Sequence, residues 1–238
     1  MRASPATVEP RSLGVLLRGN PEQLHEWLER GGVGSMAFSI AVIFAGAGLY
    51  GAAMGCWRAP LQALFVALQL PLILLLTTGG NALLNAMLAP LLGLNITFRQ
   101  SFLAILMSFT IVCAILGSFS PLAAYLVWNS PPMTTDAVLS SGTYSFIQVT
   151  HVAVIAFAGV VANVHLVNVL RRMSGRGAVA RRVLVAWLAG NLFLGSQLCW
   201  VLRPFIWDPA GKVEFIGRQY FHGSFYETVF DALRRLIF

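Results

Sequence analysis

The long apolar stretches of this sequence contain no acidic residue. Only 11% of its 238 residues are charged, against roughly a quarter in an ordinary soluble domain. All nine acids lie between or beyond the apolar stretches. Pumps and coupled transporters usually place a carboxylate inside the membrane as a proton or cation relay. The absence argues against a stand-alone proton-coupled carrier, and it excludes an intramembrane protease that uses paired aspartates.

Catalytic and metal-binding motifs are also missing. Cys56, Cys113 and Cys199 lie in or beside apolar stretches without C-x-x-C spacing, so they indicate neither a disulfide framework nor a metal site. The sequence has no H-E-x-x-H, no glycine-rich phosphate loop and no G-x-S-x-G. We therefore predict a protein that is not an enzyme, with no catalytic residue, bound metal or cofactor.

The sequence is rich in long apolar stretches, and 57% of its residues are hydrophobic. A helix needs about 20 apolar residues to cross about 30 Å of hydrocarbon, and several stretches reach that length. They predict an all-α polytopic membrane protein with about five transmembrane helices in a bundle over 32–206. We expect a cytoplasmic N-terminal segment, 1–31, and a C-terminal loop and amphipathic helix in 207–238. The first apolar stretch starts too late for a cleaved signal peptide.

The orientation follows from a helical hairpin predicted over about 145–205. Its two apolar runs flank the short loop RRMSGRGAVARR, residues 171–182, which carries five arginines and no acid. Arginine in short loops marks the cytoplasmic side, so we predict the N-terminus inside and the C-terminus outside. The net charge of +7 is explained by this topology and by contact with lipid headgroups. We expect no nucleic-acid partner.

Residues 59–94 leave the number of crossings open. One continuous helix of this length would extend about 54 Å, and prolines and the pair Gly79-Gly80 interrupt it. In one interpretation a kinked span ends near Gly79-Gly80 and a second helix, 81–92, continues at the cytoplasmic interface. In the other, the two pieces cross separately or form a re-entrant pair. A single crossing keeps the arginine-rich N-terminus inside, so we favour five spans.

Amphipathic helices are predicted at both ends of the chain. Asn20 and Pro21 start a helix as N-cap and first helical residue, and this helix should run to Arg30. We expect it on the membrane surface or docked on the protein's own cytoplasmic face, with a partner-binding role as the alternative. Ser224 and Glu227 have the spacing of a capping box. The helix that they start should lie in the outer interface.

Small residues recur through the first span, where Ala47, Gly51 and Gly55 stand four apart on one helix face. Such a face lets another backbone approach closely. It indicates packing within the bundle or, alternatively, a dimer seam.

Neutral polar side chains in the spans are the remaining candidates for a functional site. Asn81 and Asn85 are i, i+4 neighbours. Such residues serve either as interhelical hydrogen bonds, worth roughly 0.6–2 kcal/mol each, or as a polar groove for a lipid headgroup or a partner helix. The candidate cluster consists of Asn81, Asn85, His151, Asn163, Asn191, Gln197 and Arg203.

Two positions allow sharper hypotheses. Arg203, beside Trp200 at the end of the last span, either snorkels to the outer headgroups or binds a fixed internal partner. Ser196 and His151 are expected at similar depth, and a serine with a base in reach can act as a nucleophile. An intramembrane serine hydrolase is therefore one alternative, although glycine and serine are also ordinary packing residues in spans.

The stretch NLFLGSQLCWVLRPFI, residues 191–206, is followed by Gly223-Ser-Phe-Tyr-Glu227. It resembles the end of a group of uncharacterised bacterial integral membrane proteins with a Gln-x-x-Trp-x-Leu-Arg-Pro-Phe core. The resemblance implies a bacterial inner-membrane protein of unassigned activity and supplies no catalytic residues. Trp207 stands where that group often has glycine. In layout alone, the chain is also similar to the five-span Yip-type membrane proteins.

The leading functional hypothesis is a non-enzymatic membrane subunit or scaffold that assembles with other membrane proteins or with itself. The second is a permease-like or lipid-handling component that works with a separate energy source. Its mark would be a continuous polar groove through Asn81, Asn85, Asn163 and Asn191.

Overall fold

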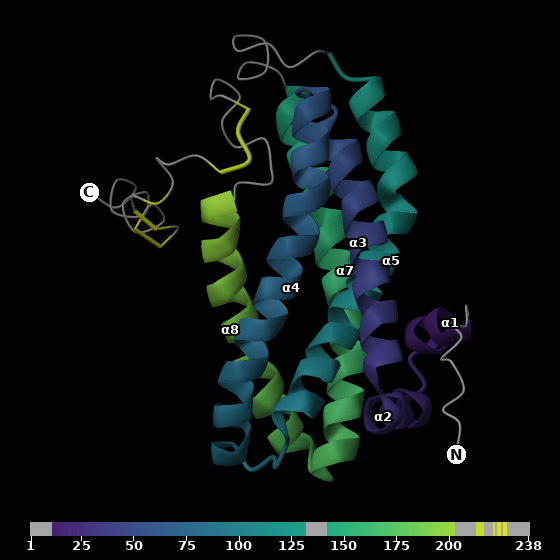
Figure 1. Cartoon of the computed structure of the whole chain (residues 1–238), viewed down its shortest axis with the longest axis vertical. Helices are drawn as coiled ribbons and strands as arrows, with labels where there is room; N and C mark the ends of the chain where they lie inside the picture. The colour runs from purple at the N-terminus through teal and green to yellow at the C-terminus, as the bar shows by residue number, and fades with distance from the viewer. Residues whose placement is uncertain are drawn as a thin grey trace.

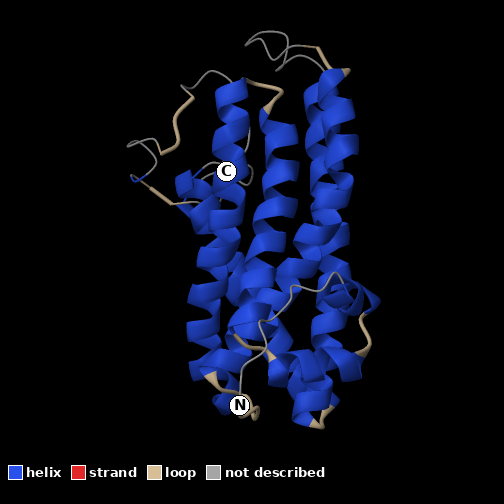
Figure 2. Ribbon diagram, turned by 45° about the vertical axis from the view of Figure 1, so that its right-hand side comes forward, coloured by secondary structure: helices blue, strands red, loops and turns tan. Residues whose placement is uncertain are grey.

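The computed structural model describes residues 11–131, 142–202, 213–216, 221, 223–224 and 226–227. Within these residues the regular structure is helical, with no strand (Figure 2). The helices are α1 (Arg11–Arg18), α2 (Pro21–Arg30), α3 (Val33–Gly55), α4 (Pro60–Leu91), α5 (Phe98–Trp128), α7 (Gly142–Ser174) and α8 (Gly177–Leu202). The prediction of an all-α fold is confirmed.

Five of these helices, α3, α4, α5, α7 and α8, are long and apolar enough to cross a membrane. Figure 1 shows them side by side as one bundle, with α1 and α2 against its flank near one end. A helix makes most of its backbone hydrogen bonds within its own segment, as a bilayer requires. The chain is therefore a multi-pass membrane protein, and the predicted five spans are confirmed.

The long stretch before α5 forms the single helix α4. The expected end near Gly79-Gly80 is wrong, because the helix continues through both glycines to Leu91. The alternative interpretation, with two separate crossings, is also wrong, because residues 60–91 form one helix. Glycine costs a helix only about 1 kcal/mol relative to alanine and is common in transmembrane helices. The helix also accommodates Pro71 within its length.

The hairpin of α7 and α8 turns more tightly than the sequence suggested. Arg171 and Arg172 belong to the last turns of α7, whereas Arg181 and Arg182 belong to α8. The connection is reduced to Gly175 and one following residue, and Gly175 adopts a φ of +62°, which favours glycine. The predicted loop of 171–182 is thus mostly helix. We call this part of the bundle the arginine-rich end.

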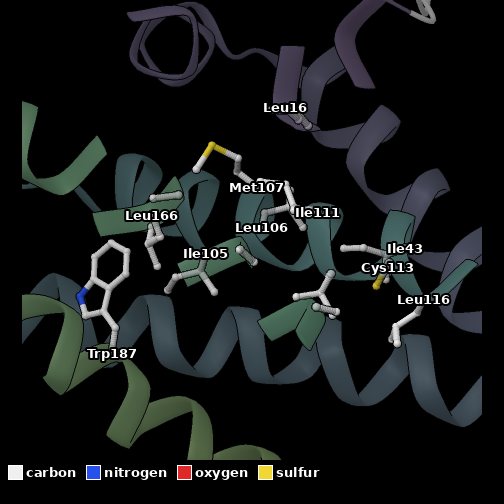
Figure 3. Close-up of a cluster of buried hydrophobic side chains, with 14 of the residues drawn as sticks. Leu16, Ile43, Ile105, Leu106, Met107, Ile111, Cys113, Leu116, Leu166 and Trp187 are labelled. Carbon is white, nitrogen blue, oxygen red and sulfur yellow. The ribbon is translucent and has the colours of Figure 1, made fainter. Parts of the chain in front are cut away.

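The small-residue face of α3 packs inside the bundle. A Cβ added at Gly51 would lie 2.8 Å from the Val66 carbonyl oxygen of α4, and one at Gly46 would collide with the Cys113 carbonyl of α5. Around these contacts lies an apolar core drawn from several helices (Figure 3). Of the two interpretations, packing within the bundle is the one realised.

The N-terminal helices α1 and α2 dock on the bundle. Asn20 caps α2 by accepting a hydrogen bond from the Glu22 amide at 3.0 Å, as predicted. Leu24 and Leu28 are almost fully buried, and α2 packs against α5 and α7. The guanidinium of Arg99 donates to the carbonyl of Gly31, where α2 ends. Docking on the protein's own surface is therefore the outcome for this helix.

The C-terminal segment is described in part. The Ser224 amide donates to Glu227 Oε2 at 2.9 Å, and the Glu227 amide donates to Ser224 Oγ at 3.2 Å, so the predicted capping box is formed. The body of the predicted helix after Glu227 lies outside the described residues, and so do Arg203 and Trp207.

Candidate functional site

The most connected polar group of the spans lies between α4 and α8. Asn81 Nδ2 donates to the Trp187 carbonyl oxygen at 3.0 Å and to Asn191 Oδ1 at 2.5 Å. Asn85 Nδ2 donates to Asn81 Oδ1 at 2.9 Å. Asn81 and Asn85 are fully buried. We call Asn81, Asn85, Trp187 and Asn191 the asparagine seam.

Local sequence explains why the asparagine seam forms here. The i, i+4 spacing of Asn81 and Asn85 places them on one face of α4, and that face contacts α8. Opposite Asn81 stands Gly190, where an added Cβ would lie 3.1 Å from Asn81 Cγ and closer still to its oxygen. The glycine thus leaves the space that the amide of Asn81 occupies.

The asparagine seam has unused hydrogen-bonding capacity. Asn85 Oδ1, Trp187 Nε1 and the hydroxyl of nearby Thr77 are buried without a partner. Asn191 is half-buried, and among the described residues its Nδ2 has no hydrogen-bond acceptor. A buried polar group without a partner costs about 1–3 kcal/mol. The seam can therefore take up a further donor or acceptor.

A second polar contact holds the C-terminal end of α8. Gln69 on α4 is fully buried, and its Nε2 donates to the Leu202 carbonyl at 2.8 Å and to the Phe215 carbonyl at 2.7 Å. The last carbonyls of a helix lack intrahelical partners, and Gln69 donates a hydrogen bond to one of them. The sequence interpretation did not include Gln69 in the cluster. A glutamine within the first third of a span, at the depth where a neighbouring helix ends, was the available signal.

His151 lies apart from the asparagine seam. Its Nδ1 is 2.9 Å from the Tyr50 hydroxyl of α3, and the two rings stack with centroids 5.3 Å apart. A cavity of about 10 Å³ adjoins the pair, which is about the space of one water molecule. The contact joins α7 to α3 and leaves no room for a larger ligand.

The remaining members of the predicted cluster do not join the asparagine seam. Asn163 Nδ2 donates to the Gly159 carbonyl of its own helix at 2.7 Å. Gln197 is half-buried on α8, and Arg203 lies outside the described residues. The structure therefore brings together three of the seven predicted residues, Asn81, Asn85 and Asn191.

The hypothetical pair of Ser196 and His151 finds no support among the described residues. Ser196 Oγ donates to the Leu192 carbonyl at 2.6 Å and lies 2.6 Å from the Tyr226 hydroxyl. His151, the proposed base, is hydrogen-bonded to the Tyr50 hydroxyl instead. Within the described residues there is also no group of three or more His, Cys, Asp or Glu that could hold a metal ion.

A larger cavity, of about 440 Å³, opens where α3 and α5 end, at the opposite end from α2. Its wall combines small side chains with two indoles, those of Trp57 and Trp128. The Trp57 indole donates to the Pro131 carbonyl at 2.9 Å. Tryptophans at this level are typical of a membrane–water interface, and none of the residues of the asparagine seam lines the cavity.

No protein-family model, no curated protein and no solved structure matches this chain at a significant level. The function must therefore be argued from the geometry of the bundle.

Proposed function

We propose that this chain is a non-enzymatic membrane subunit or scaffold that assembles with other membrane proteins. It resides in a bacterial inner membrane, with the N-terminus and the arginine-rich end inside and the C-terminal segment outside. The observation that carries the proposal is the asparagine seam, in which the buried Asn81 is hydrogen-bonded to the buried Asn85 on its own helix and to α8. Polar groups used in this way fix the arrangement of a bundle.

The exposure of α8 supports assembly. Only 11% of its most apolar 18-residue stretch is buried, against 50% in α4 and in α5. Among the helices of the bundle it packs against α4 and α7 alone. Its outward face carries the exposed side chains of Leu188 and Leu192, whereas the ring of Phe193 stacks on Tyr226 of the same chain. A span that is so little covered by its own chain offers a long apolar surface to another transmembrane helix.

The proposed orientation has its support at the arginine-rich end. Arg171, Arg172, Arg176, Arg181 and Arg182 all gather at the turn between α7 and α8. Helix α2 docks close by, because Glu22 pairs with Arg172 at 3.3 Å. Cations concentrated at one end of a bundle favour the cytoplasmic side.

A permease-like or lipid-handling component is the second candidate function. It is favoured by the unpaired oxygens of Thr77 and Asn85 on α4, which a ligand could use if α8 moved away. Against it, Asn163 is bonded within α7 and Asn81 is sealed from solvent. The expected groove through all four asparagines is therefore not open in this arrangement.

Purification of the tagged full chain in mild detergent tests the proposal, with the co-eluting chains identified and quantified. We expect a second membrane protein in fixed stoichiometry, and we expect its yield to fall in the double variant Leu188→Ala/Leu192→Ala, which trims two exposed side chains of α8. The matched control is Leu64→Ala/Leu68→Ala, which trims two exposed side chains of α4. Isolation as a lone chain that conducts solute in reconstituted vesicles would overturn the scaffold proposal in favour of the permease.

A further inference from the structure

Asn191 occupies an unusual place for an incompletely paired amide. It is the fifteenth of the 26 residues of α8, counting from Gly177, and so lies within about 3 Å of the middle of the span. Its Oδ1 accepts one hydrogen bond, from Asn81, and an amide oxygen can accept two. Its Nδ2 carries two N–H donors with no acceptor among the described residues.

The position decides what can satisfy this amide. Water does not reach the centre of a bilayer, and an unpaired polar group there costs several kcal/mol. Lipid tails carry no acceptor at that depth. Because Asn191 is only half-buried in its own chain, a second transmembrane helix has access to it and can supply the missing partner.

A second copy of this chain is the partner that fits best. The Asn191 amide has both a free N–H donor and a free lone pair, so it is its own complement. In a two-fold interface the same patch of each subunit meets itself. Two Asn191 side chains across the axis would therefore each donate Nδ2–H to the other's Oδ1, and no separate matching group is needed. A different protein would need an acceptor at the same depth.

The surface around Asn191 suits such a crossing. Leu188 and Leu192 stand next to Asn191 on the outward flank of α8, and both are exposed. Leu184 and Gly195 belong to the side that packs on the chain's own core and on Thr77 of α4. The two exposed leucines supply apolar contact beside the amide. A single polar residue among apolar contacts can fix the register and the copy number of packed helices.

We propose that two copies of this chain pair through α8 within the membrane, with the Asn191 amides hydrogen-bonded across a two-fold axis. The inference rests on the proposed role in assembly and names one partner and the residue that recognises it. The glycine-rich face of α3 cannot serve as the seam, because α4 and α5 already cover it.

The test uses the full chain, labelled with one fluorophore per copy, in vesicles of phosphatidylethanolamine and phosphatidylglycerol at a series of protein-to-lipid ratios. Stepwise photobleaching counts the copies. We expect dimers for the wild type and for Asn191→Gln, which keeps the amide. For Asn191→Leu we expect the dissociation constant to rise about three- to thirty-fold, as the loss of one or two membrane hydrogen bonds implies.

The matched control is Asn163→Leu, because Asn163 is also half-buried but bonds only to its own helix; it should dimerise like the wild type. A second measurement tests the same contact without the Asn191→Leu variant, in case that variant misfolds. In a background with Cys56→Ser and Cys199→Ser, Asn191→Cys should form an intermolecular disulfide on oxidation, whereas Leu68→Cys, exposed on α4, should not.

A wild type that stays monomeric at every density, or an Asn191→Leu variant that dimerises equally well, would overturn the inference. The proposed function would survive that result if the monomer still purified with a different membrane protein in fixed stoichiometry. If neither a second copy nor another chain were found, both proposals would fall.

Discussion

The amide of Asn81 both donates and accepts hydrogen bonds, and Gly190 leaves the space that this amide needs. Its nitrogen serves Trp187 and Asn191 on α8, and its oxygen serves Asn85 on α4. Gly190 faces it so closely that a methyl group would overlap the amide. At the residue scale, the contact between α4 and α8 thus depends on one asparagine and one glycine acting together.

Replacing Gly190 by alanine should therefore destabilise the protein. The new Cβ would displace the Asn81 amide and leave its partners unpaired in a buried place, at a cost of about 1–3 kcal/mol. We expect a lower midpoint of thermal unfolding in detergent. Gly159→Ala is the control, since no atom lies within 4 Å of a Cβ at Gly159, and alanine is the better helix former. Equal midpoints for Gly190→Ala and Gly159→Ala would contradict this account.

At the scale of elements, α2 shows what holds an interfacial helix in place. Its two most buried side chains, Leu24 and Leu28, point into the bundle. Its ion pair between Glu22 and Arg172 is exposed, and exposed ion pairs contribute about 0–1 kcal/mol. Removing a buried leucine side chain costs about 2–5 kcal/mol. Hydrophobic burial therefore dominates the docking of α2.

Leu24→Ala should loosen α1 and α2 while the bundle stays folded. We expect faster cleavage of the N-terminal segment by trypsin in detergent, and an unchanged pattern for the rest of the chain. Arg172→Ala should leave the cleavage rate within about twofold of the wild type, because it removes only the exposed pair. If Arg172→Ala released the segment and Leu24→Ala did not, electrostatics would be the stronger contribution.

The elements were largely predictable from sequence because length, hydrophobicity and caps determine them locally. The number of spans matches the prediction, and Asn20 begins α2 as expected. The interruption expected at Gly79-Gly80 failed because local glycine preferences were derived in water. Depth along a helix could be counted, but its rotation could not. Asn163 and Asn191 were therefore grouped together, although only Asn191 faces α4.

At the scale of the whole molecule, α8 is attached to the bundle at a few defined places. The asparagine seam and Gln69 join it to α4 at two levels, and the tight turn at Gly175 joins it to α7. One side of α8 belongs to the core, and Tyr226 of the same chain stacks on Phe193. Leu188 and Leu192 remain exposed, so a partner can contact them without disturbing that core.

The sidedness of the bundle decides which compartment any partner segment outside the membrane must come from. Arg176 stands in the turn at the arginine-rich end, and Asn129 is exposed where α5 ends, at the other end of the bundle. In a background without the exposed Cys56, we expect a membrane-impermeant maleimide to label Asn129→Cys in intact cells. Arg176→Cys should react only after permeabilisation, because arginine-rich turns stay in the cytoplasm. The reverse pattern would invert the proposed orientation. The contacts within the bundle would remain, but α1 and α2 would then be docked on the outer surface of the membrane.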